Sequence, residues 1–403
     1  MNIKRLSAAN PRVLAVNSGS SSLKVGLYEN DDGQLSKLVS GSASGVGRVD
    51  GSLKLVATNG EVLLDRSYSL STQQQALGEI MQALTLVSPG EIYAIGHRVV
   101  HGGPNLHAHQ IITPDVLETL KDSVHFAPLH IPPSVVLIEE MSRLLPDVPQ
   151  FACFDTAFHA TLPPVAYHYA LPERFHEQGL RRYGFHGLSY ESIVARLKED
   201  GELPRRLICA HLGSGASLAA VLDGKSVDTS MGLTPLGGIP MSSRPGDLDP
   251  GVLIYILREE RFTADALEQM LNHQSGLYSL SGGETDMQSL VASRNKGGPR
   301  ATLAVEVFAM GVRKFIGAYA AVLGGVDMLV FSGGIGEHSE EVRALCCQGL
   351  EPLGVTPEQA RHPESGGKVR VMQADEEKQI AGHCFRLLQE AGPVLVQPST
   401  GST

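Results

Sequence analysis

Residues 14–24 read Leu-Ala-Val-Asn-Ser-Gly-Ser-Ser-Ser-Leu-Lys, and this stretch decides the first element of the fold. The stretch begins with an apolar run. Small residues follow Asn17, and a second apolar run begins after Lys24. The pattern predicts two strands joined by a tight hairpin loop. The N–H groups of such a loop, together with Lys24, can hold phosphate oxygens, and Asn17 can offer an amide oxygen to a metal-bound water. Most hairpins rich in Gly and Ser are only turns, so the rest of the chain must decide between these interpretations.

The composition limits the class of protein. With 403 residues, the chain is long enough for two domains that each bury a core. An apolar fraction of 42% is typical of soluble globular proteins. The net charge of −10 argues against nucleic acid as a partner, because that would need a basic surface stripe. It does not exclude an anionic substrate, since local arginines can override the overall field.

The ends and the cysteines predict a cytoplasmic location. The first eleven residues contain no apolar segment of the kind found in signal peptides. The sequence also contains no run of about 18 apolar residues, so we expect no membrane-spanning helix. The five cysteines are scattered and lack the paired spacing of a zinc site. Reduced thiols are therefore expected.

Two later segments repeat or extend the pattern of the first hairpin. Residues 207–225 repeat the order of the first hairpin: apolar strand, small-residue loop, apolar strand, polar turn. We interpret this as an internal duplication at domain scale. Residues 327–339 predict a buried strand that ends in Gly-Gly-Ile-Gly, and glycines between a strand and a helix N-terminus are a natural nucleotide site. On its own this glycine pattern is a weak signal, but it is much stronger after a third apolar strand in a chain with a duplicated hairpin.

Four polar residues stand out in the segments between. Arg98 lies in the predicted strand 92–100, where it is either a paired edge residue or directed towards a ligand. Asp155 follows an apolar strand and is either a helix cap or a functional carboxylate. His186 lies in a glycine-flanked loop, which is unusual for a core histidine. Arg244 lies in a long loop, 228–252, whose apolar residues argue against disorder.

Helical spacing predicts the remaining elements. Helices are expected over 72–86, within 252–274, over 301–323 and from about 375 to 390. The segment 124–136 contains Pro128, Pro132 and Pro133, and we expect it to be a rigid segment that interrupts helix formation. Acidic residues such as Glu376 at a helix start are commonly partners of the helix dipole, so a metal role for Glu376 needs other support.

Taken in order, seven segments resemble the acetate kinase family of short-chain carboxylate kinases, within the actin-like ATPase superfamily. They are residues 17–24, 96–103, 154–159, 183–187, 211–217, 229–249 and 333–337. The resemblance implies an α/β fold with two actin-like (ribonuclease H-like) domains, related by duplication, and an active-site cleft between them. The first domain is expected to comprise residues 1–150 and the C-terminal helix, about 376–403. The second, nucleotide-binding domain is expected to comprise residues 151–375.

The resemblance also implies roles for individual residues. The expected catalytic residues are Asp155, His186, Arg244 and Arg98. The substrate is expected to contact Arg98 and an apolar wall of Val100, Leu129, Phe185 and Pro235. The expected nucleotide-binding residues are Lys24, His211, Leu212, Gly213, Ser214, Gly215, Asp286, Met287, Gln288, Gly333, Gly334, Ile335, Gly336 and Glu337. Asn17 and Glu376 are expected to serve the metal.

The activity implied is reversible, ATP-dependent phosphorylation of acetate to acetyl phosphate, a step of acetyl-CoA metabolism. The implied cofactors are ATP and Mg²⁺, with Mn²⁺ as an alternative ion, and the implied assembly is a homodimer. A carboxylate is already ionised at pH 7, so it needs no deprotonation before it attacks. We therefore predict that Asp155 stays ionised and orients an arginine instead of acting as an essential base.

Three departures from the family pattern keep alternatives open. Ser214 stands where the family usually has Asn, Gln288 stands where it usually has Arg, and residues 130–134 lack the family's usual asparagines. One alternative is a kinase directed towards propionate or butyrate, because a methylene contributes only roughly 1–3 kcal/mol of discrimination. The other is a non-catalytic actin-like protein that binds a nucleotide and has a regulatory role.

Overall fold

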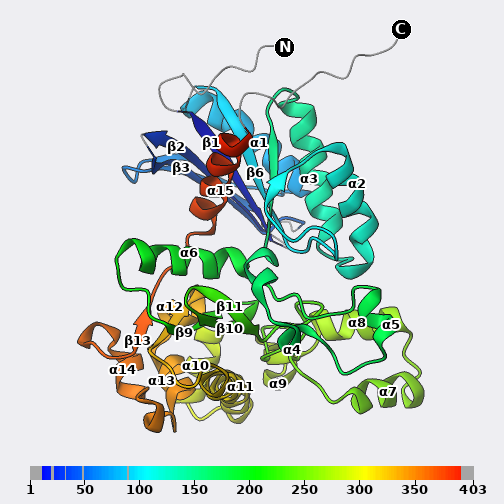
Figure 1. Cartoon of the computed structure of the whole chain (residues 1–403), viewed down its shortest axis with the longest axis vertical. Helices are drawn as coiled ribbons and strands as arrows, with labels where there is room; N and C mark the ends of the chain where they lie inside the picture. Colours follow the sequence, from blue (N-terminus) through cyan, green and yellow to red (C-terminus); the bar gives the residue numbers. More distant parts are fainter. Residues whose placement is uncertain (1–10, 20–21, 32, 48–49, 89, 392–403) are drawn as a thin grey trace. The chain divides into compact units, whose positions relative to one another are not determined.

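The computed structural model describes residues 11–391 except 20–21, 32, 48–49 and 89. The chain forms two compact units (Figure 1). The first unit combines Met1–Ala157 with Asp375–Thr403, and the second is Phe158–Ala374. Ser20 and Ser21 of the predicted phosphate loop lie outside the described residues, as do residues 1–10, on which most of the signal-peptide prediction depends.

The first unit is built on an eight-stranded mixed sheet with the order β5-β4-β3-β2-β1-β6-β8-β7. Its strands are β1 (Arg12–Ser18), β2 (Ser22–Asp31), β3 (Gln34–Ser44), β4 (Ser52–Ala57), β5 (Val62–Ser67), β6 (Ile92–Val99), β7 (Gln110–Ile111) and β8 (Gln150–Phe154). The pairs β1–β6 and β6–β8 are parallel, and the other pairs are antiparallel. The predicted hairpin is confirmed: β1 and β2 pair with Asn17 opposite Lys24.

Helices cover this sheet. They are α1 (Gln73–Val87), α2 (Pro114–Asp122), η1 (Ser123–Phe126), α3 (Ile131–Leu144) and α15 (Glu376–Ala391). Leu14 and Leu77 belong to one core cluster, which joins β1 to α1. The expected interruption lies at residues 127–130, between η1 and α3, whereas Pro132 and Pro133 lie in the first turn of α3. A proline is tolerated there, since the first N–H groups of a helix have no partner within it.

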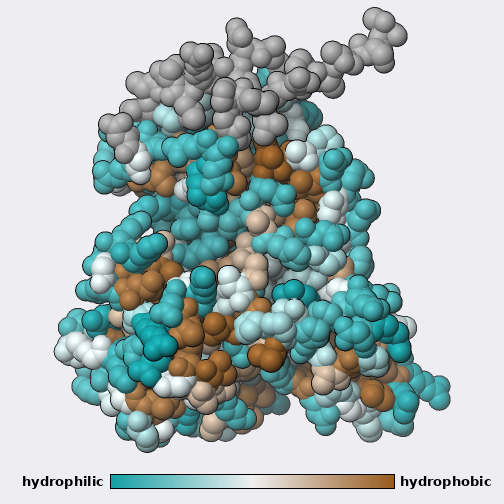
Figure 2. All heavy atoms as spheres, in the orientation of Figure 1, coloured by the Kyte–Doolittle hydropathy of each residue, from teal (hydrophilic) through white to brown (hydrophobic). Residues whose placement is uncertain are grey.

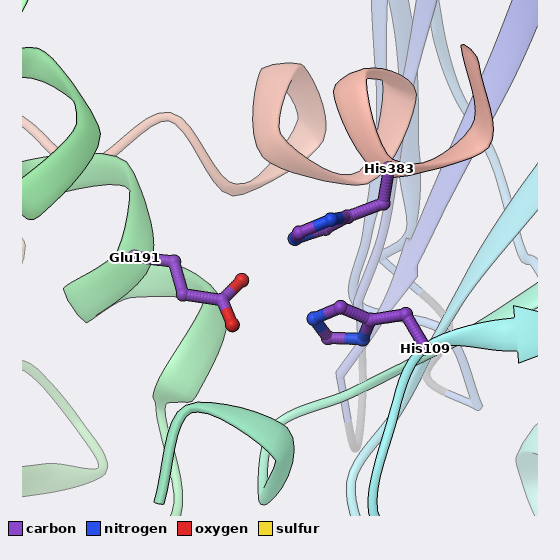
Figure 3. Close-up of side chains that lie close together, drawn as sticks. All are labelled: His109, Glu191 and His383. Atoms are coloured by element: carbon purple, nitrogen blue, oxygen red, sulfur yellow. The ribbon is translucent and has the colours of Figure 1, made fainter. Parts of the chain in front are cut away.

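The C-terminal helix α15 belongs to the first unit, although it follows the whole second unit in the sequence. Gly96 of β6 allows it to approach closely, since a Cβ at this position would lie 2.4 Å from Ile380 Cγ2. Further along α15, the His383 ring lies on the His109 ring with 3.9 Å between centroids (Figure 3). His109 Nδ1 in turn accepts a hydrogen bond from the Phe154 N–H at 3.0 Å. These contacts tie α15 to the sheet.

The second unit repeats the inner part of the first sheet. Its order is β11-β10-β9-β12-β13, with strands β9 (Arg206–Leu212), β10 (Ala216–Leu222), β11 (Lys225–Thr229), β12 (Met328–Ser332) and β13 (Val369–Val371). Strands β9, β10 and β11 form an antiparallel meander. Strand β12 pairs parallel with β9, and β13 pairs parallel with β12. Strands β3-β2-β1-β6-β8 have the same order and directions. The shared topology supports the predicted duplication.

The remaining helices belong to the second unit, except that η2 begins at the last residue before it. They are η2 (Ala157–Thr161), α4 (Pro164–Tyr167), α5 (Glu173–Glu177), α6 (Gly187–Glu199), α7 (Pro250–Glu259), α8 (Ala264–His273), α9 (Gly276–Ser281), α10 (Met287–Asn295), α11 (Pro299–Leu323), α12 (Gly333–His338), α13 (Glu340–Cys347), η3 (Glu351–Leu353), α14 (Pro357–Arg361) and η4 (Pro363–Ser365). The long loop before α7 is anchored by the fully buried side chains of Met231, Ile239 and Met241.

The boundary between the units falls later than residue 150, where we expected it. The reason is that β8 pairs with β6 from Ile95–Gln150 to Val99–Phe154, so this strand is part of the first sheet. On the face in view in Figure 2, hydrophilic residues predominate and apolar residues gather in patches. Among the described residues, no helix combines the length and the apolar character needed to span a bilayer.

Candidate active site

Arg98 and Asp155 form a largely buried ion pair in the first unit. Arg98 lies near the end of β6 and Asp155 directly follows β8, so two parallel neighbouring strands deliver them to the same edge of the sheet. Arg98 Nε donates to both Asp155 oxygens at 3.0 and 2.9 Å, and Nη2 donates to Oδ2 at 2.5 Å. Asp155 is 1% exposed. This geometry orients the guanidinium, as predicted for Asp155, while the catalytic roles of both residues stay predictions.

Asn17 connects this pair to the start of α15. Its Oδ1 accepts a hydrogen bond from Arg98 Nη1 at 3.2 Å. Its Nδ2 donates to Glu376 Oε2 at 2.9 Å and to Glu377 Oε1 at 2.8 Å. Arg98 Nε also lies 3.9 Å from Glu376. Residues from β1, β6, the end of β8 and α15 therefore form one polar group, which we call the Arg98 cluster: Asn17, Arg98, Asp155, Glu376 and Glu377.

The electrostatics of the Arg98 cluster keep its arginine charged. Burial on its own lowers the pKa of Arg98, but Asp155 and Glu376 more than offset it, so the pKa of Arg98 is raised overall. The cluster contains three carboxylates against one guanidinium. An added cation would therefore be stabilised here.

A divalent metal ion fits this set of donors. The two glutamates and the Asn17 amide oxygen are the hard oxygen ligands that Mg²⁺ and Mn²⁺ prefer. The shared bonds to Asn17 Nδ2 bring the two carboxylates together at one polar atom. Sequence reasoning named Asn17 and Glu376 but missed Glu377, for which the Asp-Glu-Glu sequence at 375–377 was the available signal.

The other predicted residues of the first unit are more exposed. Lys24 is exposed on β2 and lines a hollow together with Lys37 and Lys54. Because directly paired residues of antiparallel strands share a face, Lys24 lies on the same face of the sheet as Asn17. Val100 is half-buried just after β6, and Leu129 is 39% exposed.

In the second unit, His186 is held in a strained backbone conformation. Its φ of 58° lies in the left-handed region, where a residue with a Cβ is uncommon, and it directly precedes α6. His186 Nδ1 lies 2.8 Å from Ser217 Oγ, and Ser217 Oγ lies 2.5 Å from the Tyr190 hydroxyl. The other ring nitrogen faces Gly215, where a Cβ would lie 3.4 Å from it. The side chain of His186 is therefore fixed beside the loop between β9 and β10.

The predicted nucleotide loops of the second unit lie side by side. Strands β9 and β12 are parallel neighbours with Ser332 opposite His211, so residues 213–215 and 333–337 follow at the same edge of the sheet. His211 Nδ1 lies 2.8 Å from Ser189 Oγ. Gly333 has a φ of 75°, and a Cβ there would lie 2.7 Å from the Leu212 carbonyl oxygen, so this position requires glycine.

Within residues 333–337, the side chain of Glu337 stabilises the loop itself. Its Oε1 accepts a hydrogen bond from the Gly333 N–H at 3.0 Å. Gly334, Ile335 and Gly336 form the body of the short helix α12. The segment 286–288 lies at the start of α10, where Asp286 caps the helix by accepting from the Ser289 N–H at 2.8 Å. Met287 is buried and Gln288 is exposed.

Arg244 differs from Arg98 in its partners. Among the described residues it has no carboxylate within ion-pair distance, and its Nη1 donates to the Pro235 carbonyl oxygen at 3.2 Å. Burial lowers the pKa of Arg244. The backbone at Gly276 packs directly against the backbone of Arg244. A Cβ at position 276 would lie 2.4 Å from the Arg244 carbonyl oxygen, and the φ of Gly276 is 62°, so this position favours glycine. A partly desolvated guanidinium without a carboxylate is a good site for an anion.

The structure thus brings some of the predicted residues together within each unit. In the first unit they are Asn17, Arg98, Asp155 and Glu376. In the second they are His186, His211 and the loops 213–215 and 333–337. Of the predicted apolar wall, Phe185 and Pro235 are buried in the second unit. Sequence reasoning missed Ser217 and Tyr190. Ser217 contacts His186 from 31 residues away, and Tyr190 contacts Ser217 from 27 residues away, so no local pattern reveals either contact.

Known proteins resemble this chain over most of its length. A model of the acetokinase family matches residues 12–382. The chain belongs to this family. An acetate kinase from Syntrophobacter fumaroxidans is 40% identical over 405 residues, which covers 94% of this chain and 98% of that relative. The predicted family is confirmed.

Two solved structures are similar to this chain over most of its length. The crystal structure of Porphyromonas gingivalis acetate kinase has 36% identity and a TM-score of 0.82, with 94% of this chain and all of that chain covered. A propionate kinase from Francisella tularensis has 34% identity and a TM-score of 0.84, with 92% and 98% covered. The α/β fold class predicted from the sequence is confirmed.

Proposed function

We propose that this acetokinase-family protein transfers the γ-phosphoryl group of ATP to acetate and forms acetyl phosphate and ADP. The observation that carries the proposal is the Arg98 cluster, in which a guanidinium that is 16% exposed is oriented by buried Asp155 next to two more carboxylates. Relatives that are named acetate kinase share 38–40% identity with this chain, which supports the same reaction.

The second unit is proposed to hold the nucleotide. Its loops at 213–215 and 333–337 present backbone N–H groups at one edge of the sheet, which suits phosphate binding. The flanking residues His211 and Leu212, and the segment 286–288, complete the proposed nucleotide-binding set. Exposed Gln288 is the member of that segment with an available polar side chain, since Asp286 caps α10 and Met287 is buried. Lys24 is proposed to add a positive charge for the nucleotide phosphates.

The metal is proposed to bind at the start of α15. Glu376, Glu377 and Asn17 would hold Mg²⁺ or Mn²⁺ and would supply hard oxygen ligands to it. When bound, the ion would neutralise charge on the phosphate oxygens. The remaining contributions come from the side chains of the protein.

The chemistry needs positioning and charge stabilisation more than it needs proton transfer. One oxygen of the ionised acetate attacks the γ-phosphorus, and the bond to the bridging oxygen of ADP breaks as the new P–O bond forms. Two anions must approach one another, and charge must be stabilised on the equatorial oxygens during the in-line transfer. Arg98, Arg244 and His186 are proposed to supply hydrogen bonds to those oxygens. Asp155 orients Arg98 and takes no proton.

Acetate is the preferred acceptor in this proposal, and propionate is the second candidate. The propionate candidate is favoured by the similarity to a structure titled as a propionate kinase. Val100, Leu129, Phe185 and Pro235 are proposed to contact the methyl end of the acid. A single methylene changes binding by only about 1–3 kcal/mol, so both acids are expected to react at different rates.

We also propose a homodimer and a cytoplasmic location. Helix α7 supports the dimer, because it carries a run of apolar residues none of which is buried within the chain. Val252, Ile254 and Tyr255 are 43%, 48% and 60% exposed. Surfaces of this kind mark protein–protein interfaces. The five cysteines are all buried and free, which fits a reducing compartment.

A hydroxylamine trap for acyl phosphates tests the reaction. The purified protein is incubated with Mg²⁺, ATP and acetate, propionate or butyrate, and the hydroxamate is measured. The proposal expects product with acetate at the highest kcat/KM. No product from any of the three acids would refute it and would favour a non-catalytic nucleotide-binding protein.

A further inference from the structure

The first turn of α15 is fixed by Asp375, which directly precedes the helix. Asp375 Oδ1 accepts a hydrogen bond from the Lys378 N–H at 3.0 Å, and its carbonyl oxygen accepts from the Gln379 N–H at 3.1 Å. This is the geometry of a helix N-cap. The cap sets where the helix begins, and the next two residues are the glutamates of the Arg98 cluster.

Two side chains of the sheet hold this cap. The Tyr28 hydroxyl donates to Asp375 Oδ1 at 3.1 Å, and Lys37 Nζ lies 3.4 Å from both carboxylate oxygens. Tyr28 on β2 is 1% exposed, whereas the Lys37–Asp375 pair is about one-third exposed or more. The buried hydroxyl is therefore the more defined of the two contacts, because exposed ion pairs contribute little.

Gly26 provides the room that this arrangement needs. A Cβ at Gly26 would lie 2.5 Å from Tyr28 Cε2 and 3.3 Å from Glu377 Cβ. The ring of Tyr28 and the stem of Glu377 thus both pack against the bare backbone of β2. The same short segment of sheet fixes the cap of α15 and one of its acidic residues.

We propose that Tyr28 and Asp375 are positioning residues for the metal site: they hold the first turn of α15 so that Glu376 and Glu377 meet the cation in one arrangement. This inference rests on the metal site proposed above. Neither residue is proposed to touch the ion. Asn17 holds the glutamate side chains from the β1 side, and the cap holds their backbone from the β2 side.

The effect should appear in metal affinity. Loss of a residue that orients a metal ligand typically lowers metal affinity about 10–100-fold. We therefore expect Tyr28→Phe to raise the Kd for Mn²⁺ by about 10-fold and to leave kcat at saturating metal within about 3-fold of the wild type. Asp375→Ala should weaken binding further, because the cap is lost as well. Asp375→Asn should restore most of the affinity, since Asn caps helices as well as Asp does.

Tyr68→Phe is the matched control. It makes the same chemical change in the first unit, but the Tyr68 hydroxyl is buried without a hydrogen-bond partner among the described residues. Binding of Mn²⁺ to the full chain is followed by the loss of the free-ion electron paramagnetic resonance signal, with and without ADP. Hydrogen exchange of the Lys378 and Gln379 amides is measured on the same variants without metal.

The two readouts separate the two proposals. The positioning role predicts weaker Mn²⁺ binding and faster exchange of both amides in Tyr28→Phe, with Tyr68→Phe like the wild type. Unchanged exchange and unchanged affinity in Tyr28→Phe would overturn it. If Glu376→Gln binds Mn²⁺ as tightly as the wild type, the metal site itself is wrong, and the inference about positioning a metal falls with it. Faster exchange in Tyr28→Phe would then show only that the hydroxyl holds the helix.

Discussion

Replacement of Asp155 by asparagine tests whether this residue orients Arg98 or acts as a base. Asparagine has the same shape as aspartate, but an NH₂ group replaces one carboxylate oxygen. This NH₂ group is a donor, and it would face the N–H donors of Arg98. Asp155 is 1% exposed and accepts all three hydrogen bonds described above. Breaking a buried ion pair usually costs about 3–5 kcal/mol of stability. We expect about 3 kcal/mol, because Arg98 keeps the Asn17 oxygen at 3.2 Å and Glu376 at 3.9 Å.

The catalytic effect of Asp155→Asn should be a misplacement of Arg98. A displacement of about 1 Å in a positioned group costs on the order of 10²-fold in rate, so kcat should fall by about that factor. The pH dependence of kcat should not change, since no proton transfer is lost. The assays are urea unfolding and hydroxamate formation between pH 6 and pH 9.

Asp327→Asn is the control for Asp155→Asn. Arg206 and Asp327 form a pair with similar short contacts, but their side chains are 34% and 33% exposed. We expect this control to lose about 1 kcal/mol or less and to keep its activity. Equal losses of stability in the two variants would refute the importance of burial. An Asp155→Asn variant that is stable, inactive and altered in its pH profile would show that Asp155 is a base.

Three further predictions concern Arg244, the face of α7 and acid stability. Arg244→Ala should lower kcat by about 10²–10³-fold with less than 1 kcal/mol lost in urea unfolding, because Arg244 has no carboxylate partner among the described residues; near wild-type turnover would contradict its role. Ile254→Glu on exposed α7 should convert the dimer to monomer in analytical ultracentrifugation, and an unchanged sedimentation coefficient would argue against this interface. Burial lowers the pKa of His97 and of His159 to about 4, whereas an unfolded histidine titrates near 6.5. The unfolded chain binds more protons between these values, so the free energy of unfolding should fall as the pH drops from about 6.5 to 4, and a flat profile in urea titrations would contradict this.

The main elements of the fold could be predicted because their patterns are local. The hairpin of β1 and β2, the repeated hairpin of β9 and β10, and the buried strand before Asp155 each combine an apolar run with glycine or small polar residues. The place of Pro132 and Pro133 could not be predicted, because proline disfavours a helix interior but suits its first turn, and the sequence does not show which applies.

The candidate site could be predicted as a set of residues but not as contacts. The bidentate pairing of Arg98 with Asp155 depends on the parallel register of β6 and β8, which the sequence does not specify. The role of Glu377 depends on how the first turn of α15 packs against β1, and one turn of helix can present either of two adjacent glutamates. The left-handed conformation of His186 is stabilised by tertiary contacts against its intrinsic preference.

The most direct test of the central claim is the turnover of Arg98→Ala in the hydroxamate assay with acetate. Arg12→Ala serves as the control, because Arg12 pairs with Glu29 on the same sheet outside the Arg98 cluster. The account predicts that Arg98→Ala loses about 10²–10³-fold in kcat while Arg12→Ala stays close to the wild type. If Arg98→Ala turns over acetate at nearly the wild-type rate, the Arg98 cluster is not the site of phosphoryl transfer.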